Sequence, residues 1–471
     1  MTKLPSLTII KPPPPPPTKE VDGNDDEPLT PAGRLFLRPE MNTIIHCAIG
    51  VEHPIDVEAI KSTVKDSLMI KHPRFSSILV RHGTREYWRP TQVDVDRHVI
   101  VVDVDREVND YVAELSVSTP LPTEKPLWEI HVMEAQRCLV FRIHHALGDG
   151  VSLMSLLLAC CREINDQSSV PTLAQPRTRR SSASGGSMMR RLSSVAASVV
   201  FSLVFCLEFV MRSLHVRDRR TAVSGGDGVE LWPRRIATAK FLIDDMKQVK
   251  NAVAKATIND VLFGVISSGL SKYLDHRNGK PLKDGLRITG VAMFNLREHK
   301  GLQDLTEMMK KKSGDRWGNK FGMLILPVHY HRSGIDPLDY VRRAKKMIDR
   351  KKRSIEAHFS YSVGKLVMSL LGSKIACLLN YRILCNTTFT FSNVLGPKEE
   401  ITIVGNPVKF IRVNTSSLPH ALTMHMLSYA GRAEMQVMVA KDIIPDPEFL
   451  ARCFEDALLE MKEAAVTVAG S

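Results

Sequence analysis

Two adjacent histidines, His144 and His145, stand in the segment Phe-Arg-Ile-His-His-Ala-Leu-Gly-Asp-Gly that covers residues 141–150. A neutral imidazole can take the proton of a hydroxyl group and later return a proton to a leaving group. An alcohol is a poor nucleophile until such a base lies within hydrogen-bond reach. The chain has no Gly-x-Ser-x-Gly motif to supply a nucleophilic serine. The pattern therefore favours direct attack of an alcohol on an acyl thioester over an acyl-enzyme route.

The elements around the pair predict how it is held. A strand over Arg137–Ile143 leads into the histidines, and successive side chains of an extended chain point to opposite faces. One histidine can then face a cavity while the other packs inward. Gly148, Asp149 and Gly150 form a turn before a helix that begins at Val151. We expect the Asp149 carboxylate to fix this loop through backbone amides or an arginine, and the glycines to allow close approach of a ligand.

Two α/β regions, residues 29–166 and 231–471, frame a linker. In the first, the hydrophobic pattern predicts a helix after Asp56, a helix over Val151–Ile164, and strands at Asn42–Val51, Ser77–Val80, His98–Val104, Trp128–Val132 and Arg137–Ile143. In the second, it predicts strands at Ile236–Ile243, Arg287–Phe294, Gly322–His329, Thr387–Ser392, Val408–Val413, Leu422–Tyr429 and Ala433–Val439. Helices are expected between these strands at Asp244–Ala256, Ile258–Leu274, Pro337–His358, Tyr361–Leu379 and Pro447–Ala465.

Residues 1–28 and 167–230 have the composition of non-core segments. The first contains six consecutive prolines and an acidic stretch, so we expect a disordered tail. The second is a basic linker that includes the apolar stretch Val195–Met211, with arginines on both sides. Its 17 residues are at the lower edge of what spans a bilayer. An interfacial helix, a true span and a helix that covers an apolar patch of the protein remain alternatives, and the dense flanking arginine favours membrane contact.

Composition limits the partners. The 471 residues carry a net charge of +13, which favours anionic partners such as lipid surfaces, phosphorylated ligands or nucleic acid. No nucleic-acid motif is present, and the basic run lies beside an apolar helix without interleaved aromatic residues, so we expect no nucleic-acid binding. The eight cysteines have no zinc-type spacing, so we expect no metal and reduced thiols in a cytosol-facing protein. The N-terminus lacks the pattern of a signal peptide.

Several segments together resemble a known family. The His-His-x-x-x-Asp-Gly pattern of residues 144–150 matches the motif of the CoA-dependent acyltransferase superfamily. Lys125-Pro-Leu-Trp-Glu129 and Thr257-Ile-Asn-Asp-Val-Leu262 resemble motifs of the wax ester synthase/diacylglycerol acyltransferases, and further blocks occur in the family's order. These later blocks are Phe294–Arg297, Trp317–Asn319 and Phe391–Pro397. The similarity covers about residues 29–465, and the overall style is similar to that of the plant members.

The resemblance implies a fold, substrates and residue roles. The fold would consist of two chloramphenicol-acetyltransferase-like domains with an active-site tunnel at their interface. Acyl-CoA would be a substrate, and no cofactor or metal would be required. His145 would be the general base and His144 a supporting residue, while Asp149 and Gly150 would order the loop. Asn259 would be a candidate oxyanion donor with Asp260 in support, although Asn259 could equally cap the helix that begins near Ile258.

The sequence leaves more than one alcohol as a candidate acceptor of the acyl group. A long-chain alcohol would give a wax ester and diacylglycerol would give triacylglycerol, and the plant-type resemblance favours wax ester synthesis. The resemblance implies a place on the cytosolic face of the endoplasmic reticulum membrane, with the plasma membrane as the alternative. An acyltransferase with a soluble alcohol or phenolic acceptor is the first competing reading, and Val195–Met211 argues against it because such an acceptor needs no membrane contact. An inactive lipid-binding protein is the second, and the intact His145, Asp149 and Gly150 argue against it.

Overall fold

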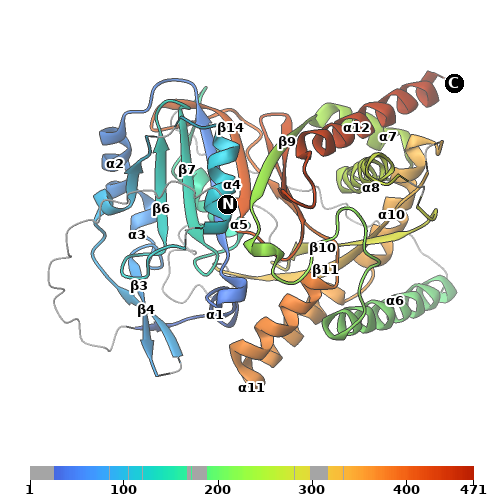
Figure 1. The fold of residues 1–471 in the computed structure, drawn as a ribbon, viewed down its shortest axis with the longest axis horizontal. Helices are drawn as coiled ribbons and strands as arrows, with labels where there is room; N and C mark the ends of the chain where they lie inside the picture. Colours follow the sequence, from blue (N-terminus) through green and yellow to red (C-terminus); the bar gives the residue numbers. More distant parts are fainter. Residues whose placement is uncertain are drawn as a thin grey trace.

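The chain forms two α/β halves that stand side by side (Figure 1). The computed structural model describes residues 26–83, 85–103, 105–118, 120–166, 171, 188–279, 282–297, 317–332 and 334–470. Most of the expected proline-rich tail, residues 1–25, lies outside the described residues. The mixed α/β class that the hydrophobic pattern predicted is confirmed.

A seven-stranded sheet forms the frame of the first half. Its order is β5-β6-β7-β2-β14-β13-β8. The strands are β2 (Ile44–Val51), β5 (Val99–Val101), β6 (Trp128–Met133), β7 (Cys138–His144), β8 (Arg162–Glu163), β13 (Ile401–Ile403) and β14 (Asn406–Thr415). The helices of this half are α1 (Pro31–Phe36), α2 (Val57–Asp66), α3 (Leu68–Lys71), α4 (Val108–Ser118) and α5 (Gly150–Ala159), with 3₁₀ turns η2 (Pro39–Met41) and η3 (Val95–Arg97).

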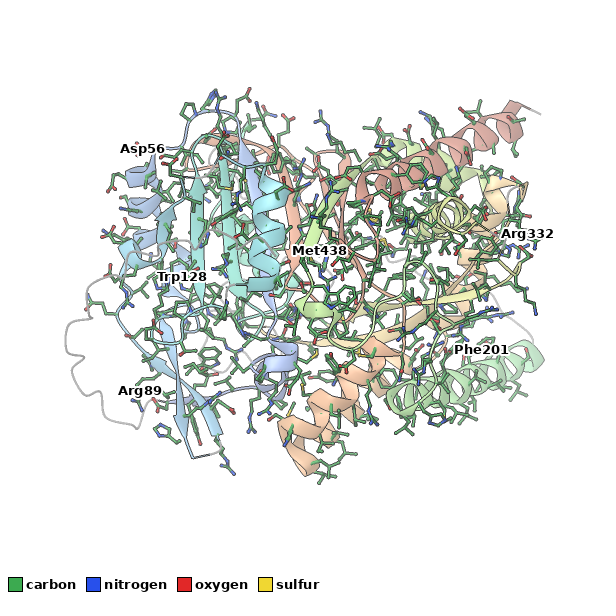
Figure 2. All side chains as sticks on the ribbon, in the orientation of Figure 1. Asp56, Arg89, Trp128, Phe201, Arg332 and Met438 are labelled. Atoms are coloured by element: carbon green, nitrogen blue, oxygen red, sulfur yellow. The ribbon has the colours of Figure 1, made fainter. Side chains whose placement is uncertain are left out.

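A six-stranded sheet forms the second half, in the order β11-β10-β12-β15-β16-β9. The strands are β9 (Arg234–Leu242), β10 (Arg287–Asn295), β11 (Phe321–His329), β12 (Phe389–Leu395), β15 (Leu422–Tyr429) and β16 (Arg432–Ala440). A large apolar core joins one face of this sheet to α7 (Ile243–Ala252), α8 (Ile258–Arg277), α10 (Pro337–Lys352) and α12 (Pro447–Gly470). The opposite face meets the first half, where Met438 and Ile236 pack against α4 (Figure 2).

The second half of the sequence contributes two strands to the first sheet, so the expected boundaries need correction. β13 and β14 come from the second half of the sequence but complete the sheet of the first half. β14 pairs with β2 from Val408 to Thr415, and β13 pairs with β8, which lies in the stretch expected to continue the helix up to Ile164. The helix ends at Ala159 because Arg162 and Glu163 pair with a strand far away in sequence. The second domain is therefore not continuous over residues 231–471.

The folded chain also begins earlier than the expected boundary at residue 28. Glu27 and Pro28 form β1, which pairs with β4 (Arg85–Pro90) in a small sheet completed by β3 (Ser77–His82). Asp26 accepts two hydrogen bonds from Arg89, at 3.0 and 2.9 Å. The Arg89 side chain holds the pKa of Asp26 down at about 2.

α6 (Met188–Leu214) contains the apolar stretch predicted from the sequence and lies along the second half (Figure 1). Toward its C-terminal end Phe209 and Arg212 are buried, and Arg212 pairs with Asp218 at 2.9 Å. The other side of the helix is open: Leu203 is 67% exposed, and Leu192, Val195, Val199 and Leu207 are all more than half exposed. One face of α6 is thus fastened to the protein while the other presents an apolar stripe.

α11 (Glu356–Cys385) is a helical hairpin. Gly372 has φ 78° and ψ 177°, which is not helical. A straight helix of this length would measure about 45 Å. Yet Ile355, just before it, donates a hydrogen bond to Ser202 of α6, and Asn386, just after it, accepts one from Arg212 of the same helix. These two positions on α6 are about 15 Å apart, so the chain must reverse at Gly372.

The apex of this hairpin is apolar and open. Leu370 is 71% exposed and Leu371 is 60% exposed, with Leu366 close behind them on the first arm. By length and composition, α6 and α11 are the two helices in the described residues that could cross a membrane, with mean hydropathies of 2.2 and 1.5. The reversal at Gly372 means that α11 is not one continuous rod. α11 and α6 both lie along the lower edge of the molecule in Figure 1.

Candidate active site

β7 ends at His144 and His145 follows in a turn, and the two side chains have different surroundings. His144 is buried. Its Nδ1 accepts a hydrogen bond from the backbone N–H of Ala146 at 3.1 Å, so its Nε2 carries the proton and donates to Oδ1 of Asn42 at 2.8 Å. Burial lowers the pKa of His144 to about 3. Both ring nitrogens are therefore occupied, and His144 braces the loop in its neutral form.

His145 is half-buried, and Asn319 holds it from the other half of the molecule. Nδ2 of Asn319 donates to the backbone carbonyl of His145 at 2.8 Å. Because that carbonyl only accepts, the amide nitrogen must face it, and Oδ1 must face the His145 ring. This oxygen lies 2.9 Å from Nδ1 of His145, so Nδ1 carries the proton of the neutral ring and Nε2 holds the free electron pair. In the described part of the chain Nε2 has no hydrogen-bond partner.

Aromatic rings and burial set the properties of His145. Its ring stacks on Phe36 with centroids 4.2 Å apart, and Phe321 meets it edge-on at 6.0 Å. Burial lowers its pKa below the ordinary value of 6.5, while the Asp149 carboxylate and the hydrogen bond to Asn319 act in the opposite direction. His145 is therefore mostly unprotonated at neutral pH, as a proton acceptor must be.

Asp149 fixes the loop by both of the contacts that the sequence suggested. Its Oδ1 caps α5 by accepting the backbone N–H of Ser152 at 3.1 Å. Its Oδ2 accepts from Nη1 of Arg297 at 2.7 Å and from the backbone N–H of Lys320 at 3.1 Å. Both side chains of the Asp149–Arg297 pair are almost completely buried. The carboxylate thus links the histidine loop, residues 144–150, to the second half of the molecule. Among the described residues, no hydrogen bond joins Asp149 to the His145 ring.

The segment Trp317–Lys320 holds the histidine loop in place through hydrogen bonds. Nε1 of Trp317 donates to the backbone carbonyl of Leu147 at 2.7 Å, and the backbone N–H of Gly318 donates to Oγ of Ser152 at 3.3 Å. A side chain at Gly148 would place its Cβ 3.3 Å from the Trp317 ring, which is a tight fit. Neither Gly148 nor Gly150 has a positive φ, so contact with Trp317, rather than an unusual backbone angle, explains the small residue at 148.

The Asn259–Asp260 pair lies in the first turn of α8. Thr257 caps this helix by accepting the N–H of Asp260, whose carboxylate accepts the N–H of Thr257 in return. The interpretation of Asn259 as the helix cap is therefore wrong. Thr257 is the N-terminal cap, and the Asp260 side chain completes the capping box. Oδ1 of Asn259 accepts from Nδ2 of Asn393 at 3.0 Å, which leaves the Asn259 amide nitrogen pointing elsewhere. Among the described residues no hydrogen bond joins Asn259 to the histidine loop.

Three residues of this site had no role assigned from the sequence. Asn319 and Arg297 stand in blocks that carried the resemblance, but nothing in their spacing indicated contact with residues 145 and 149. His425 on β15 is buried, and its Nδ1 has no hydrogen-bond partner in the described structure. Burial, and to a smaller extent the charge of His145, lower the pKa of His425 to about 4, so the two side chains interact electrostatically. Only the alternation of its strand could have indicated that His425 faces the first half.

Trp128 is a packing residue of the first half. It is buried, stacks on His98 at 3.9 Å, and donates from Nε1 to the backbone carbonyl of Phe75 at 2.9 Å (Figure 2). Within the described ranges no three His, Cys, Asp or Glu side chains form a group that could hold a metal ion. The tautomer that Asn319 holds allows Nε2 of His145 to accept a proton and to return it.

Both halves match known protein families. Residues 54–262 match the wax ester synthase/diacylglycerol acyltransferase catalytic domain, and residues 317–462 match the WS/DGAT C-terminal domain. The chain is 38% identical to wax ester synthase/diacylglycerol acyltransferase 11 of Arabidopsis thaliana, over 94% of this chain and 96% of that protein. It is 37% identical to wax ester synthase/diacylglycerol acyltransferase 5 of Arabidopsis thaliana, over 94% of each chain.

Solved structures agree on the fold. A wax ester synthase/diacylglycerol acyltransferase from Marinobacter aquaeolei aligns with a TM-score of 0.59 at 18% identity, over 93% of this chain and 100% of that one. A trichothecene 15-O-acetyltransferase from Fusarium sporotrichioides aligns with a TM-score of 0.56 at 11% identity, over 93% and 95% of the two chains. At these identities the likeness concerns the fold, and it confirms the two-domain acyltransferase architecture that the resemblance implied.

Proposed function

Since the chain belongs to the wax ester synthase/diacylglycerol acyltransferase family, and is therefore an acyltransferase, we propose that it moves a fatty acyl group from acyl-CoA to a long-chain alcohol and to diacylglycerol. The observation that carries the mechanism is the held tautomer of His145, with Nδ1 engaged by Asn319 and Nε2 free. An unprotonated nitrogen at the end of a fixed strand is what the activation of a hydroxyl requires.

The proposed reaction uses one base and one tetrahedral intermediate. The acceptor hydroxyl gives its proton to Nε2 of His145 as its oxygen bonds to the thioester carbonyl carbon. The intermediate collapses, the carbon–sulfur bond breaks, and the imidazolium returns the proton to the CoA thiolate. His144 and Gly150 would hold the loop, while Asp149 would position His145 without exchanging protons itself. No acyl-enzyme forms.

Asn259 is proposed as a donor to the developing oxyanion, with Asp260 holding the turn that carries it. Support comes from the contact with Asn393, which occupies the Asn259 oxygen and leaves its nitrogen for another acceptor. Asn393 also lies beside the histidine loop through its neighbour Val394, whose Cγ2 is 3.5 Å from the position of a Cβ on Gly150. Removal of one such donor typically lowers kcat by about 10²–10³-fold.

The lipid acceptors imply a membrane surface, and we propose that the molecule rests on one through α6 and the apex of α11. The open apolar stripe of α6 and the exposed Leu370 and Leu371 support this contact. Because Phe209 and Arg212 are buried against the protein, α6 would lie in the plane of the bilayer instead of crossing it. The cytosolic face of the endoplasmic reticulum membrane is the proposed location, with the plasma membrane second, and wax ester is proposed as the main product.

Esterification of labelled palmitoyl-CoA with either hexadecanol or diacylglycerol tests the proposal. We expect the native protein to form both esters, with wax ester in excess, and His145→Ala to lose about 10²–10⁴-fold of the rate. His53→Ala is the matched control because His53 is exposed and belongs to the start of the first half. Unchanged turnover in a folded His145→Ala protein would refute the base. Absence of both esters with the native protein would refute the lipid acceptors.

A further inference from the structure

A groove of about 390 Å³ lies where α6 meets α10. Phe201 of α6, which is labelled in Figure 2, forms one side. The other side consists of Asp349 and five basic residues of α10 and its end. None of these residues belongs to the site around His145. The groove therefore joins the apolar helix of the proposed membrane face to a strongly basic one.

Much of this charge is not neutralised within the protein. Arg342 pairs with Asp336 and Asp339, and Lys345 pairs with Asp349 at 2.6 Å. Lys346, Arg350 and Arg353 are exposed, and no ion pair to any of the three occurs in the part of the chain that the structure describes. The groove thus presents three free cations along one side of α10.

Ordinary helix electrostatics does not account for all three cations. Basic residues in the last turn of a helix stabilise its macrodipole, which explains Arg350 and the cap residue Arg353. This effect falls off within one turn. Lys346 lies more than one turn before the helix ends at Lys352, yet it lines the same groove.

The position of the groove relative to α6 indicates the ligand. The open stripe of α6 lies opposite the face that carries Phe201, Phe205 and Phe209, because Phe209 is buried and Phe205 packs under Lys351. A helix at a membrane interface sinks about 5–10 Å, and it is about 10–12 Å thick with its side chains. When the open stripe lies among the acyl chains, the Phe201 side is level with the phosphate groups.

We propose that the α6–α10 groove binds the phosphate groups of anionic phospholipids in the bilayer on which α6 rests. Lys346, Arg350 and Arg353 would bind the phosphates through charge-assisted hydrogen bonds, and Phe201 would contact the adjoining glycerol and upper acyl chain. This inference rests on the membrane contact proposed above. It adds a preference for lipid charge that an apolar stripe alone does not have.

Vesicle binding by the full chain tests the groove. The triple variant Lys346→Gln, Arg350→Gln, Arg353→Gln is compared with Lys65→Gln, Lys71→Gln, Arg81→Gln, which removes the same charge from exposed sites in the first half. Sedimentation is measured with phosphatidylcholine vesicles and with vesicles that also contain phosphatidylserine, at low and high salt. Turnover of hexadecanol in neutral detergent micelles confirms that each protein is folded and active.

We expect phosphatidylserine to strengthen binding of the native protein and of the control triple, and this gain to disappear at high salt. The groove triple should lose roughly 10-fold or more of its affinity for the anionic vesicles while binding neutral vesicles like the native protein. An equal loss in both triples would mean a general charge effect and would overturn the proposal, as would full binding by the groove triple. Absence of binding to neutral vesicles would instead refute the apolar contact of α6 and α11. Absence of micelle turnover in the native protein, with the vesicle results as expected, would refute the acyltransferase proposal and leave the groove proposal standing.

Discussion

His145 owes its working tautomer to Asn319, which lies 174 residues further along the chain. The amide cannot turn around, because its nitrogen must donate to the backbone carbonyl of His145. One side chain therefore decides which ring nitrogen is free and where it points. We infer that Asn319 is a positioning residue, which acts on the reaction through His145 and does not touch the substrate.

Asn319→Asp should move the pH dependence of the reaction. A carboxylate beside Nδ1 favours the imidazolium, so it should raise the pKa of His145, which burial keeps below 6.5 in the native protein. Because the protonated ring is inactive, the acid limb of kcat/KM should shift upward by about one pH unit. Asn319→Ala should lower kcat without this upward shift. An Asn319→Asp profile that coincides with the native one would refute the role of Asn319.

α11 illustrates why an apolar stretch does not settle its own geometry. From composition the helix was expected over Tyr361–Leu379, and the observed helix runs from Glu356 to Cys385 with a reversal at Gly372. A glycine there is required, since the φ of 78° is unfavourable for any residue with a Cβ. The result is a short apolar hairpin in place of a rod, and a hairpin can enter one leaflet of a bilayer.

Leu370→Ser with Leu371→Ser should weaken membrane binding. The two leucines are exposed at the apex, so they gain apolar burial only when the hairpin enters a bilayer. We expect affinity for neutral vesicles to fall roughly 10-fold or more, with turnover in micelles unchanged. The double variant Leu459→Ser, Val466→Ser on α12 is the control, because these residues are also more than half exposed, on a different helix. Equal losses in both variants, or no loss in the first, would exclude insertion of the apex.

At the scale of the whole molecule, donation of two strands joins the second half to the first. β14 carries residues of the second half into the first sheet. The ion pair between Arg297 and Asp149 is a second link between the halves. The first sheet is therefore incomplete without β13 and β14 from the second half of the sequence. The site at the junction therefore depends on folding of the entire chain.

Buried neutral histidines in both halves make the fold sensitive to acid. Burial lowers the pKa of His98 and His425 to about 4 and that of His144 and His420 to about 3. The unfolded chain binds protons near pH 6.5 while these folded residues do not, so stability falls as the pH drops below 6.5. At about pH 5.5 each of these histidines lowers the free energy of unfolding by about 1.4 kcal/mol.

The melting temperature should therefore fall clearly between about pH 7.5 and pH 5.5. The strongly paired carboxylates Asp26 and Glu129, with pKa values of about 2, contribute stability that is lost only below about pH 4.5, so they do not account for a loss in this range. Thermal unfolding followed by circular dichroism at a series of pH values is the measurement. A constant melting temperature over this interval would contradict neutral burial of these histidines.

The sequence by itself determined the features that depend on residues close together in the chain. The histidine segment, the strand before it and the helix after it are local patterns, and the structure has β7 and α5 at these positions. The order of the family's motifs was readable for the same reason, and with it the acyltransferase class. Most strands of the second half were placed correctly because alternation and hydrophobic runs act within a few residues.

Only the tertiary structure decided which distant residues meet. Asn319, Arg297 and His425 reach the site through contacts between the halves, and a hydrogen bond between residues far apart leaves no periodic signal in either segment. The same reason applies to β8 and β13, which form a sheet edge only because they pair with each other. The reversal at Gly372 and the groove beside Phe201 likewise follow from packing of α11 and α10 against α6. Short-range patterns fix elements, whereas long-range pairing, which the sequence does not display, brings them together into a site.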